Sequence, residues 1–253
     1  MLERDQKKLW SARAENYSRL CWVSDNNLEA KILEVGDFKS DHCVLDAGTG
    51  TGAVARSIAP YVKVVHGIDQ SPEMLALAKN NGENNINYQL GDIRNMPFSS
   101  SYFDRVTSRN VFHNILDSGD RQNAVAECFR VLKPKGKFVF SEGVPPHESL
   151  KADFEKIFSL KEIRITFSIQ DIVDLLSIVG FSDIKSYSAV AKDFELNNWL
   201  DNDGTLNSSV KKAIIDLHIH SSEKFKELYN LRVQGSSVLI DTVSAFVVGT
   251  KAL

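Results

Sequence analysis

The chain has little of the chemistry that holds small secreted proteins or membrane proteins together. Its 253 residues include three cysteines, Cys21, Cys43 and Cys128, an odd number without the close pairs of a zinc site or a disulfide framework. We therefore expect free thiols in a reducing, cytoplasmic setting, with Cys43 and Cys128 buried, and no metal site. No run approaches the roughly 20 apolar residues that span a bilayer. The first residues are charged, unlike a signal peptide.

An excess of positive charge is also missing. The 30 Lys and Arg residues and 33 Asp and Glu residues give a formal net charge of −3. Such a chain has no global attraction to nucleic acid or to an anionic membrane, and no stripe of mixed aromatic and basic residues favours nucleic acid. The composition, 43% hydrophobic and 25% charged, is that of an ordinary globular protein. It leaves a local patch for a peptide or an RNA open.

What the chain does have is a glycine-rich turn in residues 44–52. Val44 and Leu45 read as a buried strand, three glycines follow at alternate positions, and a helix-like segment, 53–59, comes next. Glycine is favoured where the backbone must turn sharply or approach a ligand closely. In an α/β sheet such a turn lies at the carboxyl edge of the strands, where ligands bind. The spacing is G-x-G-x-G, whereas dinucleotide-binding folds have G-x-G-x-x-G.

Acidic residues end the next two predicted strands. Asp69 follows the apolar stretch 61–68 and precedes a helix with Ser71 as its N-cap. Asp92 follows the predicted strand 86–90. An acid at the end of the second strand is placed to accept hydrogen bonds from the hydroxyls of a ribose. The alternatives are a helix-capping or surface carboxylate for Asp69 and a turn-capping one for Asp92.

Together these segments resemble the motifs of the class I S-adenosylmethionine (SAM)-dependent methyltransferases. The resemblance rests on Asp46-Ala47-Gly48-Thr49-Gly50-Thr51-Gly52, Asp69, Gly91-Asp92, Phe103-Asp104-Arg105-Val106 and Arg109-Asn110-Val111. It covers about residues 40–190, and the Arg-Asn-Val run is closest in style to the methyltransferases of ubiquinone and menaquinone biosynthesis. The family implies an α/β, Rossmann-like sheet of seven strands in the order 3-2-1-4-5-7-6, with strand 7 antiparallel and helices flanking the sheet.

The resemblance also implies SAM as the cofactor and S-adenosylhomocysteine (SAH) as its product. In this family Asp92 would receive the adenine amino group, and Ile93 would pack on the ring. An A-x-x-Y-like element, matched by Ala14 to Tyr17, implies an aromatic ring over the cationic sulfonium, with core packing as the alternative. The expected cofactor contacts are Tyr17, Asp46, Ala47, Gly48, Thr49, Gly50, Gly52, Asp69, Gln70, Met74, Gly91, Asp92, Ile93, Ser108 and Arg109.

His113 is the candidate catalytic residue, just beyond the fourth predicted strand, 103–108. One interpretation makes it a polar residue that stabilises the loop and the next helix. The other makes it a substrate contact or a general base. Transfer of a sulfonium methyl needs chiefly alignment and the exclusion of water. A base therefore matters only where the nucleophile must lose a proton.

We expect a single domain with two elaborations. The expected parts are a helical cover, 1–39, a SAM-binding core, 40–190, a helical insertion that covers the substrate, 193–235, and a final core strand, 236–253. The insertion is predicted because a featureless loop of that length is uncommon in a compact domain. A charged amphipathic helix is expected over about residues 150–166.

The sequence thus predicts a SAM-dependent methyltransferase that acts on a small, apolar or aromatic metabolite. The first alternative is a non-catalytic SAM-binding or partner protein on the same fold, because binding is not turnover. The second is an NAD(P)-dependent oxidoreductase, which Asp69 suits but the glycine spacing and Gly91-Asp92 do not. The acceptor, the atom methylated and the oligomeric state stay open.

Overall fold

The structure, a computed structural model, describes residues 3–17, 26–80 and 83–253. Its centre is a sheet in the order β3-β2-β1-β4-β5-β8-β6, with β7 paired to β8. The strands from β3 to β5 are parallel, and β8 runs antiparallel to β5 and β6. The strands are β1 Cys43–Ala47, β2 Val64–Asp69, β3 Ile86–Leu90, β4 Phe103–Arg109, β5 Leu132–Val144, β6 Ser182–Glu195, β7 Arg232–Gln234 and β8 Ser237–Thr250. The predicted order is confirmed; the predicted seventh strand is β8 because the short β7 precedes it.

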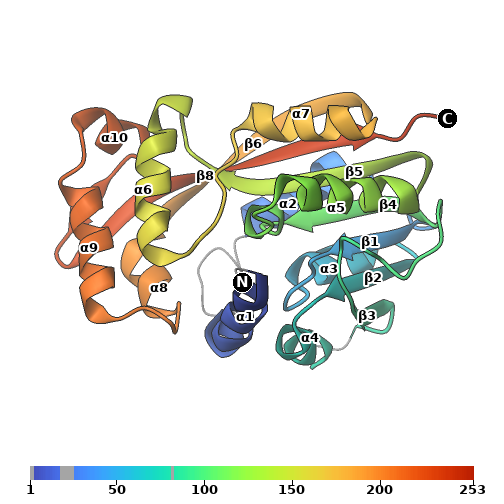
Figure 1. The fold of residues 1–253 in the computed structure, drawn as a ribbon, viewed down its shortest axis with the longest axis horizontal. Helices are drawn as coiled ribbons and strands as arrows, with labels where there is room; N and C mark the ends of the chain where they lie inside the picture. The colour runs from blue at the N-terminus through green and yellow to red at the C-terminus, as the bar shows by residue number, and fades with distance from the viewer. Residues whose placement is uncertain (1–2, 18–25, 81–82) are drawn as a thin grey trace.

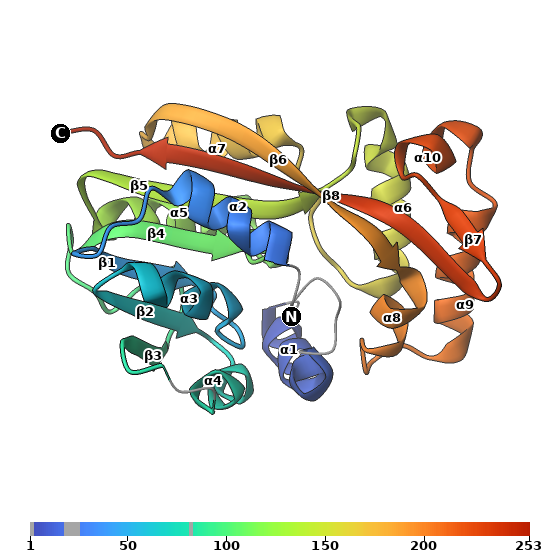
Figure 2. The ribbon, with the colours of Figure 1, turned by 180° about the vertical axis from the view of Figure 1, so that it is seen from behind.

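Helices cover both faces of this sheet. α5 and α7 pack on one face, and α2 and α3 pack on the other (Figures 1 and 2). The helices are α1 Glu3–Tyr17, α2 Asn26–Gly36, α3 Ala53–Ile58, α4 Pro72–Lys79, α5 Ser118–Val131, α6 Lys151–Lys161, α7 Ile169–Val179, α8 Leu196–Asp201, α9 Ser208–Ile219 and α10 Glu223–Leu228, with short 3-10 turns η2 Ala59–Tyr61, η3 Phe112–Asn114 and η4 Glu148–Leu150. None of these described helices is long and apolar enough to cross a membrane.

A second lobe forms where β6 and β8 extend past the sheet. Figure 1 shows α6, α8, α9 and α10 gathered around the far ends of these two strands. This lobe has its own apolar core, which includes Phe154, Leu196, Trp199, Ile214 and Phe225. The segment 193–235 therefore supplies three helices to a separate core, and α6, from earlier in the chain, packs with them.

The helix expected over about 150–166 is shorter than predicted. α6 ends at Lys161, and Glu162 turns away in an extended conformation, with φ −161° and ψ 154°. Residues 162–168 run on without helix until α7 begins at Ile169. The prediction was wrong at this end because Glu162 is buried against Arg13 of α1, a contact distant in sequence that a helical pattern does not reveal.

α1 lies at the junction of the two lobes (Figure 2). On one side, Ser11 Oγ donates a hydrogen bond to Glu73 Oε2 of α4 at 2.6 Å. On the other side, Arg13 pairs with Glu162 and Asp203. The next helix, α2, packs instead against the sheet, where Leu28 and Ile32 join the core with Val44. Within the N-terminal segment, α1 is therefore the helix that bridges the two lobes.

Candidate active site

The glycine turn after β1 adopts left-handed backbone conformations. Gly48 has φ +74° and Gly50 has φ +54°. A Cβ atom at Gly48 would lie 2.3 Å from a methyl group of Val111, so this glycine permits close packing of two loops. A Cβ atom at Gly50 would meet nothing within 4 Å. Gly50 therefore turns its bare backbone toward open space, as a close approach to a ligand requires.

Asp46 holds the turn from within the sheet. Its carboxylate accepts hydrogen bonds from Thr49 Oγ1 at 2.7 Å and from Thr107 Oγ1 at 2.9 Å. Burial raises the pKa of the Asp46 carboxyl, and these two hydroxyl donors act in the opposite direction. Asp46 thus ties the loop to β4, and its burial leaves little of the carboxylate exposed.

Asp69 joins the glycine turn to the start of α4. Its Oδ2 accepts a hydrogen bond from the Gly50 amide at 2.9 Å, and its Oδ1 accepts one from the Ser71 amide at 2.9 Å. Burial raises the pKa of this carboxyl, while its backbone donors lower it. Each oxygen of an ionised carboxylate can accept a further hydrogen bond. Asp69 can therefore still serve two hydroxyl groups side by side.

Asp92 is more exposed and already paired. Arg94 reaches both oxygens of Asp92, with Nη2 to Oδ2 at 2.6 Å and Nε to Oδ1 at 3.0 Å. Burial opposes ionisation of Asp92, but the bonds from Arg94 outweigh it and lower the pKa. Any ligand amino group at Asp92 must therefore share the carboxylate with Arg94.

A pocket opens where these loops meet; we call it the glycine-loop pocket. Eleven of the fifteen expected cofactor contacts line it: Asp46, Gly48, Thr49, Gly50, Asp69, Gln70, Met74, Gly91, Asp92, Ile93 and Arg109. Ala47 and Ser108 are buried within their strands instead, and a Cβ atom at Gly52 would collide with Tyr88. The side chain of Tyr17 lies outside the described residues. Trp10 and Asn110 also line the pocket.

The residues present fit an adenosyl sulfonium. The bare backbone of Gly50 leaves room for the ligand, and Asp69 keeps accepting capacity for ribose hydroxyls. Met74 and Ile93 add apolar surface. Arg109 Nη1 is buried without a hydrogen-bond partner and lies 3.9 Å from Glu29 Oε1. A guanidinium in that state suits the carboxylate of an amino-acid group.

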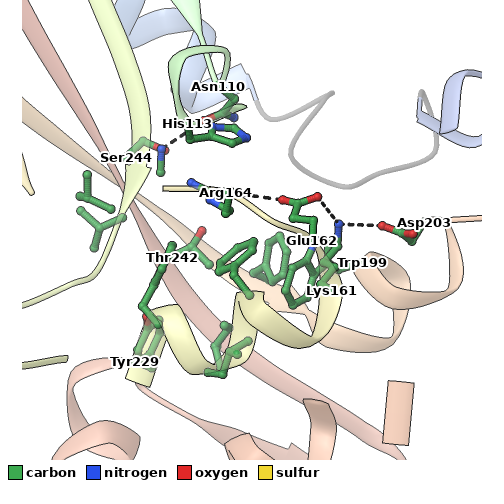
Figure 3. Close-up of a pocket in the computed structure, with 18 of the residues that line it drawn as sticks. Asn110, His113, Lys161, Glu162, Arg164, Trp199, Asp203, Tyr229, Thr242 and Ser244 are labelled. Atoms are coloured by element: carbon green, nitrogen blue, oxygen red, sulfur yellow. Dashed lines mark hydrogen bonds and ion pairs between the residues drawn. The ribbon is translucent and has the colours of Figure 1, made fainter. Parts of the chain in front are cut away.

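A second pocket, which we call the aromatic pocket, lies between the sheet and the second lobe (Figure 3). Its walls are mostly apolar and include Phe154, Phe158, Phe194 and Trp199. Trp10 and Asn110 line this pocket and the glycine-loop pocket alike. The two pockets therefore meet at these two side chains.

His113 lines the aromatic pocket and is held by Glu142. His113 Nδ1 lies 2.7 Å from Glu142 Oε2, and the amides of Phe112 and His113 donate to Glu142 Oε1 at 2.8 and 3.3 Å. A carboxylate that takes these amide donors acts as an acceptor, so Nδ1 carries the proton. Nε2 is then the ring nitrogen left for a ligand. Glu142 has no exposed side-chain surface.

A cluster of buried ion pairs forms the polar end of the aromatic pocket. Lys161 Nζ lies 2.6 Å from Asp203 Oδ2 and 3.2 Å from Glu162 Oε2. Arg13 contacts the same two carboxylates at 2.7 and 2.5 Å. Burial opposes ionisation of Glu162, but the charges of Lys161 and Arg13 outweigh it and hold the pKa far below its ordinary value. Sequence reasoning missed this cluster because its members come from α1, α6 and the loop after α8.

Known proteins are similar to this chain in sequence and fold. The family model described as a methyltransferase domain matches residues 45–140. An uncharacterised methyltransferase of Bacillus subtilis is 25% identical over 78% of this chain and 79% of its own length. The demethylmenaquinone methyltransferase of Thermotoga maritima is 36% identical over 55% of this chain and 62% of its own length. The crystal structure of the B. subtilis YcgJ protein superposes with a TM-score of 0.76 at 22% identity, over 89% of this chain and 98% of that one.

The sheet order and the matched domain indicate the same fold. Residues 45–140 match the methyltransferase-domain family model, and the sheet has the strand order of the class I SAM-dependent methyltransferase fold. SAM is the methyl donor of this class. The motif style expected from the sequence agrees with the menaquinone-pathway relative from T. maritima.

Proposed function

We propose that this protein transfers the methyl group of SAM to a small acceptor with an apolar or aromatic body. SAM would occupy the glycine-loop pocket and the acceptor would occupy the aromatic pocket. The observation that carries the proposal is the pair of shared lining residues, Trp10 and Asn110, because methyl transfer requires the two substrates to meet. Aromatic side chains in the second pocket favour a flat or apolar acceptor.

The cofactor would be held by the loops at the strand ends. We propose that Asp69 accepts hydrogen bonds from the ribose hydroxyls, that Asp92 receives the adenine amino group beside Arg94, and that Gly50 gives the backbone room for the ligand. When bound, SAM supplies a methyl group on a sulfonium that is already a good leaving group. The protein's task is then to orient the two substrates and exclude water. In favourable intramolecular models, orientation is worth roughly 7–11 kcal/mol.

His113 would act on the acceptor's proton where there is one. In this proposal Nε2 takes the proton from a hydroxyl or amine as the methyl group arrives, and Glu142 stabilises the resulting imidazolium through Nδ1. His113 contacts the substrate in this scheme, so it is a catalytic residue. Glu142 acts through His113 and is a positioning residue.

The proposal is tested by SAH formation over a panel of phenols, catechols, hydroxyquinones and aromatic amines. The wild-type protein should release SAH with at least one of these compounds, and the product should gain the mass of one methyl group. Calorimetry should show binding of SAM but not of NAD. Binding of SAM without methylation of any panel compound would favour the non-catalytic alternative.

A matched pair of variants links turnover to the proposed cofactor contact. Asp69→Asn keeps an oxygen for the Gly50 amide but loses the charge, and should weaken SAM binding by about 1.5–3 kcal/mol, as expected for a lost charge-assisted hydrogen bond. Asp183→Asn, at an exposed position near the start of β6, is the control and should bind SAM as the wild type does. Equal SAM affinity in a folded Asp69→Asn variant would remove Asp69 from the cofactor site.

A further inference from the structure

Arg164 is a buried cation on the wall of the aromatic pocket, with donors that are not used. Its Nη2 is buried without a hydrogen-bond partner among the described residues. Nε donates to the Ile165 carbonyl oxygen at 3.3 Å. Nη1 lies 3.8 Å from Glu162 Oε1, which is an ion pair but too long for a hydrogen bond. Figure 3 shows the side chain beside Glu162, near His113 and Ser244.

The carboxylates around Arg164 are bonded to other groups. Glu142 takes the His113 ring and two backbone amides. Glu162 and Asp203 take Lys161 and Arg13 at between 2.5 and 3.2 Å. Each carboxylate therefore has hydrogen-bond donors without Arg164, and each of the other two cations has short contacts. Arg13 Nε and Nη2 also lack a hydrogen-bond partner, but Nη2 of Arg13 lies 2.7 Å from Asp203 Oδ2, whereas Arg164 makes no ion pair shorter than 3.8 Å among the described residues.

Two aromatic rings pack near the Arg164 guanidinium, and the N–H groups at its edge stay available for an acceptor. The Cζ atom of Arg164 lies 4.3 Å from the ring centre of Phe158 and 5.6 Å from that of Phe154. Such stacking favours a charged guanidinium over a ring. The N–H groups at the edge keep the geometry that matches two oxygens of one anion. Burial lowers the pKa of Arg164, while the charges of Glu142 and Glu162 raise it. Burial therefore disfavours the charged form of Arg164, and a further anion would stabilise it.

We propose that Arg164 binds an oxyanion of the methyl acceptor, so that the acceptor is an aromatic or apolar compound carrying a carboxylate or a phosphate. This inference rests on the proposed function, because it assigns the substrate class of the aromatic pocket. The apolar body would lie along Phe154, Phe158 and Trp199. The anion would supply the oxygen atoms that Nη2 lacks. A carboxylate and a phosphate share this chemistry, and the experiment separates them.

The test measures binding of three probes of one shape to the SAH-loaded protein. The probes are 2-naphthoate, 2-naphthyl phosphate and the neutral 2-naphthamide, followed by calorimetry. At least one anion should bind the wild type about tenfold or more tightly than the amide, as a charge-assisted contact requires. The anion that the wild type binds more tightly then shows whether the acceptor carries a carboxylate or a phosphate. Equal binding of the amide, or no binding of either anion, would overturn the proposal.

Variants place the preference on Arg164. Arg164→Gln should remove the preference for the anion while naphthamide binding changes little, and Arg164→Lys should keep part of it. Lys185→Gln, an exposed lysine on β6, is the control and should keep the whole preference. A preference that persists in Arg164→Gln would contradict the assignment. If Arg164→Gln does not fold, the proposal is still tested by the anion preference of the wild type and by its partial retention in Arg164→Lys.

The same samples distinguish this inference from the proposed function. SAH binding is measured first, without a probe, and does not involve Arg164, which is not among the residues that line the glycine-loop pocket. If the wild type does not bind SAH, the proposed function is contradicted, whatever the result with the probes. Normal SAH binding with no preference for an anion would overturn the Arg164 assignment and leave methyl transfer to a neutral acceptor in place.

Discussion

At the scale of single residues, the site is built from polar groups whose partners limit their roles. Asp46 gives both of its oxygens to hydroxyls that hold the glycine turn. Asp69 serves two backbone amides and still has lone pairs to offer. His113 has one nitrogen committed to Glu142 and the other available. Asp46 is almost fully buried, whereas Asp69 is partly exposed, so Asp69 and His113 are the ones of these three placed to act on a ligand, while Asp46 shapes the turn that receives one.

Replacement of His113 by Gln should slow methyl transfer to an acceptor that must lose a proton. If Nε2 takes that proton, kcat should fall by about 10²–10⁴-fold, the usual contribution of a general base. SAM affinity should stay unchanged, because His113 does not line the glycine-loop pocket. The measurement is SAH formation under single-turnover conditions with saturating SAM.

Two further variants separate chemistry from structure at His113. His147→Gln replaces an exposed histidine and should keep the wild-type rate. Glu142→Gln should lower kcat and leave acceptor KM and SAM affinity near the wild-type values, because the charge that stabilises the imidazolium is lost; a purely structural role would change KM together with kcat. An unchanged rate in a folded His113→Gln variant would leave the histidine with a structural role.

At the scale of elements, two glycines of the β1–α3 turn have different roles. Gly48 faces Val111, from the loop after β4, while Gly50 faces open space within the glycine-loop pocket. Both have a positive φ, so both need glycine on backbone grounds. They differ in what an added methyl group would meet. A substitution at Gly48 therefore tests packing between two loops, and one at Gly50 tests the approach of the ligand.

Gly50→Ala and Gly48→Ala should fail in different ways. Gly50→Ala should lower the free energy of unfolding by about 1–2 kcal/mol, the cost of a left-handed non-glycine residue, and should weaken SAM binding because its methyl group enters the pocket. Gly48→Ala should cost more stability because its methyl group also clashes with Val111 at 2.3 Å. Urea unfolding and calorimetry with SAM make the comparison. Equal SAM affinity in Gly50→Ala and the wild type would argue against a close approach at Gly50.

The sequence was most informative where function depends on local pattern. The glycine turn follows β1, Asp69 ends β2, and Asp92 lies two residues beyond β3, so spacing and the family resemblance together predicted that most of these residues gather at one edge. The aromatic pocket was less predictable. Lys161 and Glu162 looked like the exposed face of a longer helix, but α6 ends at Lys161 and both side chains are buried. Their partners, Arg13 and Asp203, are distant in sequence, and periodicity carries no information on such pairs.

At the scale of the whole molecule, α1 and the long strands β6 and β8 join the two lobes (Figure 1). The strands give a continuous backbone connection, whereas α1 depends on side chains, Ser11 toward α4 and Arg13 toward the second lobe. Arg13 is the link to the second lobe through Glu162 and Asp203. Because Trp10 on the same helix lines both pockets, the position of α1 bears on both substrates.

This link should make stability depend on pH. The pKa of Glu162 in the folded state lies below its ordinary value of 4.5. Its ionic contribution is therefore fully present above pH 4.5 and is lost as the pH falls below it. At pH 7, Glu162→Gln should lower the free energy of unfolding by about 3 kcal/mol, the low end for removing one partner of a buried pair, because Arg13 and Lys161 each keep a contact with the Asp203 carboxylate.

The difference between Glu162→Gln and the wild type should shrink as the pH is lowered. Below pH 4.5 the unfolded wild type takes up a proton at Glu162 while the folded state keeps the carboxylate, so the wild type loses stability relative to the variant, and the two proteins converge only as the pH approaches the lowered folded-state pKa. Urea unfolding at a series of pH values from 7 to below 4.5 provides the measurement. Glu223→Gln, an exposed member of a surface pair, is the control and should differ little from the wild type throughout. A constant difference across the series would show that the charge of Glu162 contributes nothing.

The second lobe allows recognition of the acceptor to be changed apart from binding of the cofactor. Trp199 and Ile214 share one apolar core, but only Trp199 of the two lines the aromatic pocket. Trp199→Ala and Ile214→Ala should each cost about 2–5 kcal/mol of stability, as for large-to-small core substitutions. Trp199→Ala should also raise KM for the acceptor and leave SAM affinity unchanged, whereas Ile214→Ala should change neither. A rise in acceptor KM of the same size in both variants would mean that the second lobe affects the acceptor only through its stability. A loss of SAM affinity in Trp199→Ala would mean that SAM and the acceptor do not occupy the two pockets as proposed.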